Sequence, residues 1–278
     1  MSANGRMDER AIAALLGTVF RGWDRWGTES CAAHGDDVLI RQEAARLAQT
    51  VALLDDGSEP RRLVEIGTGY LTLATTLRHR FPDAEMIGVE HPQRPYVWMP
   101  EYRVRLAEER IRLVAADLTG SGLPFRSQTF DVAVFAEVVE HLPPHAVPAA
   151  LAEIGRILAP RGVLVLTTPN LAAWSNRELL LWGHSPQQSP SRVIDGTYGH
   201  LRLYTMAELV ALLEEAGFTV ARRTFSDQVA VGLSLIRRVL RALLWPARVL
   251  CPSLRDTCMI RAVRVEGGIE SARRESLP

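Results

Sequence analysis

The sequence predicts an α/β fold with a seven-stranded, mostly parallel sheet, helices on both faces and a helical cap before the first strand. From residue 62 onward, short apolar runs alternate with helical segments. These runs are almost continuously apolar, as is typical of parallel strands that are buried on both faces. Two helical patterns precede residue 62 with no strand between them.

The N-terminal region contains these two helices. Apolar residues recur at helical spacing over 8–20, and a second helix is expected over about 38–54. Charged residues at positions 8 to 10 precede the apolar part, so we expect no signal peptide. We interpret residues 1–58 as a helical cap or lid and residues 59–266 as the main domain.

Strands and helices then alternate along the main domain. The predicted strands are 63–66, 86–89, 111–114, 130–135 and 163–167. The predicted helices between them are 70–80, 101–109 and 144–158. Strand–helix alternation of this kind predicts parallel pairing, because each helix carries the chain back across the sheet.

The last third of the chain is less uniform. Residues 170–204 are irregular and are expected to form a substrate loop. Thr205 and Glu208 have the spacing of a capping box that opens a helix over 206–216. Strands near 218–225 and 257–265 flank a helical insertion at 231–250, and a disordered tail is expected at 267–278.

Composition limits the class of protein. The chain has 278 residues, 47% hydrophobic and 23% charged, and its formal net charge is zero, so no overall field favours nucleic acid. Lys is absent, which we attribute to the codon bias of a GC-rich bacterial genome. Cys31, Cys251 and Cys258 fit neither a zinc site nor a disulfide framework, and therefore indicate reduced thiols and a cytoplasmic location. No apolar run is long enough to span a membrane.

A short glycine turn follows the first predicted strand. That strand ends at Glu65, and Gly67 and Gly69 follow before a helix begins. Glycines there let the backbone turn tightly and approach a ligand at the carboxyl edge of the sheet. The pattern alone is equally typical of a structural turn or of several nucleotide-binding folds.

Two more acids end the next strands. Glu90 closes the second strand, at a distance from the glycines that suits a bidentate acceptor for ribose hydroxyls. Asp117 closes the third strand, where it could accept from an adenine amino group with the amide of Leu118 nearby. Each acid could also be a solvated strand end, but three in order are far more specific than one.

These motifs resemble those of the class I S-adenosylmethionine-dependent methyltransferases, of the small-molecule type. Further motifs carry the resemblance, which covers about residues 60–225: Leu123-Pro124-Phe125, Glu137-Val138-Val139-Glu140-His141-Leu142, Thr167-Thr168-Pro169-Asn170 and Glu214-Glu215-Ala216-Gly217-Phe218. A nicotinamide dehydrogenase, the main alternative, would place glycine at position 72, where Thr72 stands.

The resemblance implies a Rossmann-like fold, S-adenosylmethionine as cofactor and a role for each motif residue. Glu65, Gly67 and Gly69 would flank the methionine part of the cofactor. Glu90 would hold the ribose, Asp117 and Leu118 would hold the adenine, and Glu137 would lie beside the sulfonium or the substrate. The family often has a third glycine where this chain has Leu71, which we expect to press the turn against its helix.

The methyl acceptor is less defined. His141 and His200 are candidate general bases, although each could be a purely structural histidine. Trp23, Trp26, Tyr198 and Arg202 are candidate substrate-binding residues, with lid packing as the alternative for the two tryptophans. No metal site is expected, because the acids and histidines lack the spacing of an oxygen-rich magnesium site.

The insertion at 231–250 has two interpretations. Arg237, Arg241 and Arg248 share one helical face, with apolar residues opposite. The segment could lie on a membrane surface, or it could be a homodimer or core-covering helix, which we favour.

Taken together, the sequence predicts methyl transfer to a small molecule, with a hydroxyl of a sugar or secondary metabolite as the preferred acceptor. Nitrogen and carbon acceptors remain alternatives, as does a binding module without catalytic activity.

Overall fold

Seven strands form one sheet in the order β3-β2-β1-β4-β5-β7-β6. The computed structural model describes residues 7–21, 37–57, 59–120, 122–187, 199–227 and 245–265. The strands are β1 (Arg62–Ile66), β2 (Glu85–Glu90), β3 (Ile111–Ala115), β4 (Phe130–Ala136), β5 (Leu158–Pro169), β6 (Phe218–Ser226) and β7 (Thr257–Arg264). Strands β1 to β5 pair in parallel, and β7 runs antiparallel to both β5 and β6. This mixed sheet confirms the predicted fold class.

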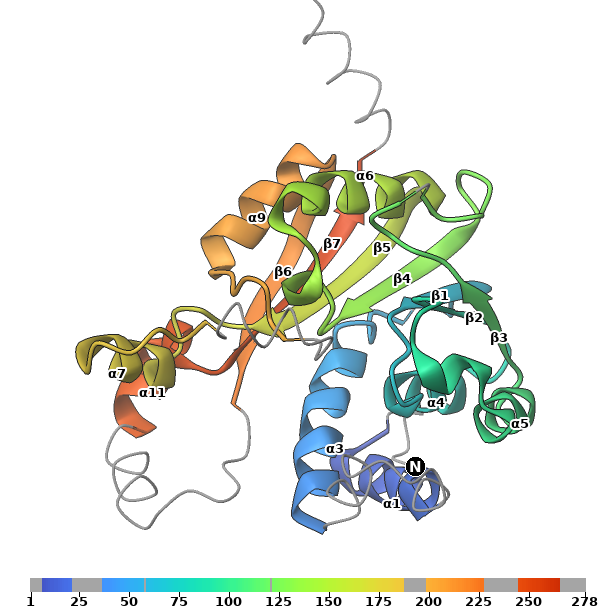
Figure 1. Cartoon of the computed structure of the whole chain (residues 1–278), viewed down its shortest axis with the longest axis horizontal. Helices are drawn as coiled ribbons and strands as arrows, with labels where there is room; N and C mark the ends of the chain where they lie inside the picture. Colours follow the sequence, from blue (N-terminus) through green and yellow to red (C-terminus); the bar gives the residue numbers. More distant parts are fainter. Residues whose placement is uncertain are drawn as a thin grey trace, which may run out of the picture.

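The helices lie on both faces of the sheet (Figure 1). One face carries α1 (Glu9–Arg21), α3 (Asp37–Ala52), α4 (Thr72–Arg80) and α5 (Pro100–Glu108). The other face carries α6 (Val147–Ile157) and α9 (Met206–Glu215). Short 3-10 segments complete the connections: η3 (Pro95–Trp98), η4 (Val139–His141), η5 (Pro144–Ala146) and η6 (Pro252–Leu254).

The N-terminal helices share a core with the sheet. Ile12 and Leu16 of α1 and Leu47 of α3 are fully buried in one cluster with Leu63 of β1 and Val134 of β4. Burial of each such side chain contributes roughly 1.5–3 kcal/mol. The predicted cap is therefore held by apolar packing, and α3 reaches the carboxyl edge of the strands.

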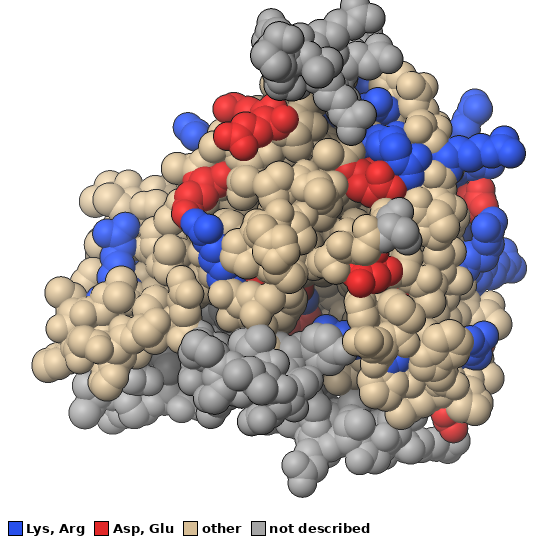
Figure 2. Space-filling view, turned by 45° about the horizontal axis from the view of Figure 1, so that its top comes forward, with Lys and Arg blue, Asp and Glu red and all other residues tan. Residues whose placement is uncertain are grey.

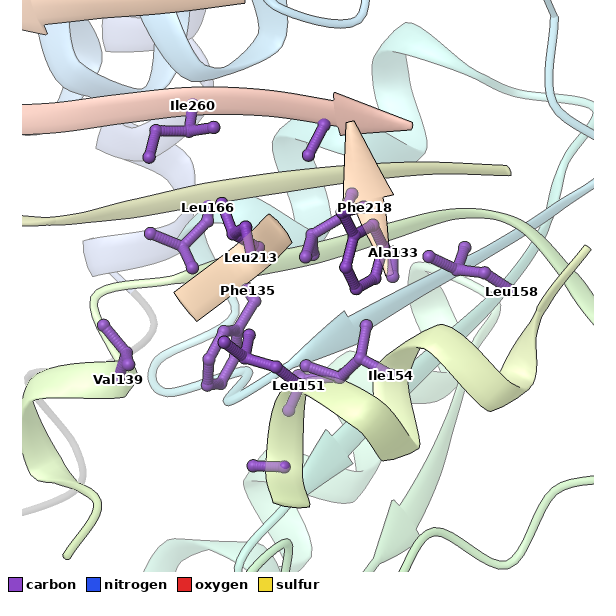
Figure 3. Packing of buried hydrophobic residues seen from close by; sticks show 14 of the residues in the cluster. Ala133, Phe135, Val139, Leu151, Ile154, Leu158, Leu166, Leu213, Phe218 and Ile260 are labelled. Atoms are coloured by element: carbon purple, nitrogen blue, oxygen red, sulfur yellow. The ribbon is translucent and has the colours of Figure 1, made fainter. Parts of the chain in front are cut away.

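The opposite face has its own apolar cluster. Leu151 and Ile154 of α6 and Leu213 of α9 pack with Phe135 and Phe218 of the sheet (Figure 3). These side chains have almost no exposed surface. The two clusters leave the strand ends, with their polar residues, as the place where a ligand can bind.

The register of β1 shows where along the strand ends a ligand can bind. Glu65 lies opposite Gly88 of β2 and Val134 of β4, so β1 sits between them with both neighbours parallel. The strand order reverses between β1 and β4, because β2 and β3 continue on one side and β5 on the other. In open α/β sheets, ligands bind at such a switch point.

The structure corrects the expectation that residues 170–204 are irregular throughout. A helix, α7 (Trp174–Leu181), lies within them. It buries none of its residues and has no side-chain cap, so it lacks the apolar periodicity by which a helix is recognised. Strand β5 also begins earlier than predicted, because Leu158 pairs with Phe130.

The insertion at 231–250 is described only from residue 245, where α11 (Trp245–Leu250) lies. Pro246 stands in its first turn, where proline is tolerated. Arg248 is not exposed, and Arg237 and Arg241, predicted on the same helical face, lie outside the described residues. Arg248 is buried and forms ion pairs with Asp227 and Asp256.

The capping box predicted at the start of α9 is confirmed. The Thr205 hydroxyl accepts from the Glu208 amide at 3.3 Å, and the Glu208 carboxylate accepts from the Thr205 amide at 2.8 Å. Thr205→Ala should therefore lower the free energy of unfolding by about 1 kcal/mol, measured by urea denaturation. Thr205→Ser keeps the hydroxyl and should therefore lower the free energy of unfolding far less. Equal losses in the two variants would contradict a capping role.

Candidate active site

A cavity of about 230 Å³ opens at the carboxyl ends of β1 and β4. The turn after β1, the end of β4 and one side of α3 line it. Its lining residues are Glu43, Arg46, Glu65, Gly67, Thr68, Gly69, Tyr70, Thr72, Leu73, Ala136 and Glu137. The cavity thus brings together Glu65 at the end of β1, Gly67 and Gly69 after it, and Glu137 beyond β4, all predicted cofactor residues.

The turn after β1 needs glycine at position 67. Gly67 has φ +84°, and a Cβ there would lie 2.3 Å from Cγ2 of Val138. Gly69 also has a positive φ, of +47°. Leu71 follows with φ 61°, in the left-handed region, and this explains why glycine suits the position. The Leu71 side chain is nevertheless fully buried in the core. The prediction that Leu71 packs the turn against its helix is confirmed.

Glu65 places a carboxylate in the wall of the cavity at high electrostatic cost. The residue is buried, and its Oε2 has no hydrogen-bond partner among the described residues. Burial and the nearby Glu90 hold the pKa of Glu65 well above its ordinary value, against the opposing effect of Arg46. A cationic group in the cavity would stabilise the ionised carboxylate.

Glu90 anchors the glycine turn from the end of β2. Its Oε2 accepts from the amide of Gly69 at 2.8 Å, and its Oε1 accepts from the amide of His91 at 2.9 Å. The Thr68 hydroxyl donates to the same Oε2 at 3.4 Å and bonds the Tyr102 hydroxyl at 2.8 Å. Glu90 is therefore fixed in position by the backbone around it.

Asp117 lies beyond β3 on the same edge and is more exposed. Its Oδ1 accepts from the amide and the hydroxyl of Thr119, at 2.8 and 2.7 Å. These hydrogen bonds lower the pKa of Asp117, with a contribution from His91, whose Nε2 lies 3.7 Å from Oδ2. The following residue, Leu118, packs partly against the apolar cluster beneath α6. Asp117 thus presents a carboxylate next to an apolar surface.

Glu137 turns the chain away from β4 in the left-handed region, with φ 56°. Its amide donates to the Thr167 carbonyl at 2.8 Å, and its Oε1 accepts from the Thr167 hydroxyl, also at 2.8 Å. Arg46 of α3 lies 3.9 Å from the same Oε1. Strain in a non-glycine residue is retained where neighbours fix it, and it is common at functional sites.

His141 and His200 come together, although they are far apart in the sequence. Their ring centroids are 5.0 Å apart. Nδ1 of His141 lies 3.3 Å from the Gly199 carbonyl. Burial, with the charge of His200, lowers the pKa of His141 to about 4, and burial also lowers the pKa of His200. Both rings are neutral near pH 7 and can offer a lone pair.

The predicted acceptor-side residues are less well placed. Arg202 forms an ion pair with Glu208 at 2.7 Å and lies over the Tyr204 ring, so its guanidinium is engaged at the start of α9. Its role in substrate binding stays a prediction. Trp23, Trp26 and Tyr198 lie outside the described residues.

Sequence reasoning missed two charged residues that line the cavity, Glu43 and Arg46. They lie three residues apart on α3 and form an ion pair of 2.6 Å, a spacing that is also typical of a solvated helix face. Nothing in the sequence placed Arg46 at the cavity. Beside Tyr70, which also lines the cavity, Tyr96 and Tyr102 form an aromatic group with ring centroids 5.3 to 5.5 Å apart.

Comparison with known proteins identifies the family. A family model described as a methyltransferase domain matches residues 39–222. The chain belongs to this family. Its domain is of the class I S-adenosylmethionine-dependent methyltransferase family, so the class that the glycine turn and strand-end acids predicted is confirmed.

The relatives of this methyltransferase are distant. A demethylmenaquinone methyltransferase of Thermus thermophilus is 30% identical over 134 residues, which are 48% of this chain and 56% of that protein. The match thus spans little more than half the length of this relative.

Two solved structures share the fold. A crystal structure of an S-adenosylmethionine-dependent methyltransferase from Mesorhizobium loti is 16% identical, with a TM-score of 0.55, over 79% of this chain and 98% of that one. The N-methyltransferase NodS from Bradyrhizobium japonicum, in complex with S-adenosyl-L-homocysteine, is 17% identical, with a TM-score of 0.52, over 89% and 99%.

The residues present in this methyltransferase fit S-adenosylmethionine. The unsatisfied Oε2 of Glu65 suits a cationic group, and the cofactor carries both an ammonium and a sulfonium. At Gly69 nothing lies within 4 Å of the place of a Cβ, so the backbone of the turn is open to the cavity that it lines. Both features concern the donor, and neither specifies an acceptor.

Replacing Glu65 tests the charge balance of the cavity. Because the pKa of Glu65 is raised on folding, the folded state holds a proton that the unfolded state releases above the ordinary value of 4.5. Stability is therefore lost as pH rises from about 4.5 through the raised pKa. Glu65→Gln should remove this loss. In urea denaturation, the substitution should therefore raise the free energy of unfolding relative to the wild type by more at pH 8 than at pH 5.

Glu85→Gln is the matched control, since Glu85 lies at the exposed start of the neighbouring strand. The effect of Glu85→Gln on the free energy of unfolding should not increase from pH 5 to pH 8. If the effect of Glu65→Gln were the same at both pH values, the raised pKa would be wrong.

Proposed function

We propose that the protein transfers the methyl group of S-adenosylmethionine to a hydroxyl of a small molecule, such as a sugar or secondary metabolite. The observation that carries the proposal is the pair of neutral histidines, His141 and His200, whose rings lie side by side beyond the end of β4. Glu137 is near enough to influence the pKa of His200. A hydroxyl is a weak nucleophile near neutral pH and benefits from a group that takes its proton.

On the donor side, we assign the predicted roles to residues at the strand ends. Glu65, Gly67 and Gly69 would hold the methionine part, and Glu90 the ribose. Asp117 and Leu118 would hold the adenine. Support comes from the arrangement described above, in which a buried carboxylate faces the cavity and the other two acids follow along the same edge.

On the acceptor side, the chain's task is to orient the hydroxyl and remove its proton. When bound, S-adenosylmethionine supplies an electrophilic methyl group and leaves as S-adenosylhomocysteine. As the acceptor oxygen gained that methyl group, its proton would pass to an imidazole nitrogen of this chain. With Nδ1 of His141 donating to Gly199, the free lone pair is on Nε2. Most of the rate enhancement would come from proximity and alignment.

Glu90 allows a direct test of the donor site. Glu90→Ala should weaken binding of S-adenosylhomocysteine by tenfold or more in calorimetry, because the ribose loses a charged acceptor and the Gly69 turn loses its anchor. Glu85→Ala, at the other end of the same strand, should bind as the wild type does. No binding by the wild type would overturn the proposed function.

His141 tests the acceptor side. His141→Ala should reduce turnover by about 10²-fold or more, as measured with radiolabelled S-adenosylmethionine and a hydroxylated acceptor panel. Its affinity for S-adenosylhomocysteine should change little, because the donor cavity does not include His141. Unchanged turnover would remove His141 from the proposed machinery and leave His200→Ala as the next variant.

The acceptor atom is the open part of the proposal. One relative is named for demethylmenaquinone and one structural neighbour is an N-methyltransferase. Product analysis by mass spectrometry and NMR distinguishes O-, N- and C-methylation. Binding of the donor with no turnover on any acceptor would favour a module without catalytic activity.

Charge argues against nucleic acid as the acceptor. Basic and acidic side chains are interspersed over the face in Figure 2, and its described residues form no continuous basic stripe. We also propose a bacterial, cytoplasmic protein, supported by the free thiols of Cys251 and Cys258. Among the described residues, no helix has the length and apolar character needed to cross a membrane.

Exposed apolar side chains on α7 and α11 support a peripheral membrane contact near 231–250. Leu181 and Trp182 at the end of α7 and Leu250 at the end of α11 are about four-fifths exposed, at 80%, 76% and 81%. Both helices project away from the sheet at the left of Figure 1. Flotation with anionic vesicles tests this contact, and Leu181→Asp should abolish it. A homodimer in solution, with no flotation, would contradict it.

A further inference from the structure

Glu140, His141 and His200 form a compact cluster of potential metal ligands. Each offers one ligand atom, and these atoms lie within 4.8 Å of one another. Glu140 and His141 belong to η4, and the chain at His200 is held against η4 by the Leu201 amide, which donates to the Glu140 carbonyl at 2.7 Å. The cluster is therefore fixed by the backbone and does not depend on surface side chains meeting.

Glu140 supplies a carboxylate that is only half satisfied. The residue is fully buried, and its Oε2 accepts from the Thr168 hydroxyl at 2.9 Å. Its Oε1 is buried too, and the described part of the chain offers it no hydrogen bond. That oxygen lies 4.0 Å from Nε2 of His141, too far for a hydrogen bond but well suited to two ligands of one ion.

His141 has the environment of a metal-binding histidine. Such residues usually donate one ring N–H to a carbonyl or carboxylate, which fixes the ring and directs the other nitrogen to the ion. Nδ1 of His141 lies 3.3 Å from the Gly199 carbonyl, while Nε2 faces Glu140.

We propose that Glu140, His141 and His200 bind one divalent cation of the Mn²⁺, Fe²⁺ or Zn²⁺ class. Two imidazoles with one carboxylate suit these ions, whereas Mg²⁺ prefers oxygen ligands alone. Three protein ligands leave further coordination positions open to a substrate or water. The sequence predicted no metal site because His200 is remote in the chain from the Glu140–His141 pair and the usual short spacing is missing.

The role of the ion rests on the proposed O-methylation. A bound cation would hold the acceptor hydroxyl and lower its pKa, so that its proton passes to water before or during methyl transfer. With the ion bound, the two imidazoles are ligands, and water replaces them as the proton acceptor in the O-methylation proposed above. Glu137 connects the two sites, because it lines the donor cavity and its charge shifts the pKa of both Glu140 and His200.

The test uses the full chain after chelator treatment, titrated with Mn²⁺ while free Mn²⁺ is measured by EPR. The wild type should bind one Mn²⁺ per chain. Glu140→Gln and His200→Ala should each bind at least about tenfold more weakly. His145→Ala is the matched control, because His145 is an exposed histidine on the neighbouring η5, and it should bind as the wild type does.

Binding of S-adenosylhomocysteine is measured in parallel by calorimetry. It should be unchanged in His200→Ala, which shows that the variant is folded and separates the ion site from the donor site. No Mn²⁺ binding by the wild type, or equal binding by the wild type and His200→Ala, would overturn the proposal. Mn²⁺ binding without binding of S-adenosylhomocysteine would instead refute the proposed function and leave the ion site standing.

Discussion

The interaction of Arg46 with the carboxylates at the edge of the sheet is the one on which the site depends. Arg46 comes from α3, outside the sheet, and lies close to Glu137 beyond β4. Its charge lowers the pKa of both Glu65 and Glu140, while Glu90 and Glu137 act in the opposite sense. A buried carboxylate without a cation nearby would be strongly disfavoured. The apolar packing that fixes α3 on the sheet therefore also supplies the site with its counter-charge.

Two strained residues show how the remaining geometry is held. Leu71 and Glu137 both adopt the left-handed conformation, which costs roughly 1–2 kcal/mol in a residue with a Cβ. Burial of the Leu71 side chain contributes roughly 1.5–3 kcal/mol and offsets that cost. For Glu137, the compensating contacts are the two hydrogen bonds with Thr167. Packing in one case and polar contacts in the other keep both turns at the cavity.

The donor half of the site could be predicted from the sequence because it follows strand ends. Glu65, Glu90 and Asp117 end or follow three neighbouring strands, and parallel pairing alone places such residues on one edge. The acceptor half depends on contacts between distant segments. His200 reaches His141 through a connection with no periodic pattern, and Arg46 reaches Glu137 through helix packing. Helix α7 was missed for a related reason, since it buries nothing against the core.

The end of β5 suggests how the two halves meet. Thr167 donates to Glu137 and Thr168 donates to Glu140, and successive side chains of a strand point to opposite faces. Glu137 accordingly lies with Arg46 on the α3 side, and Glu140 lies on the side of α6 and α9. The donor cavity and the Glu140–His141–His200 cluster therefore approach the strand ends from opposite faces. The alternation of Thr167 and Thr168 at one strand end is therefore what separates the two clusters while keeping them adjacent.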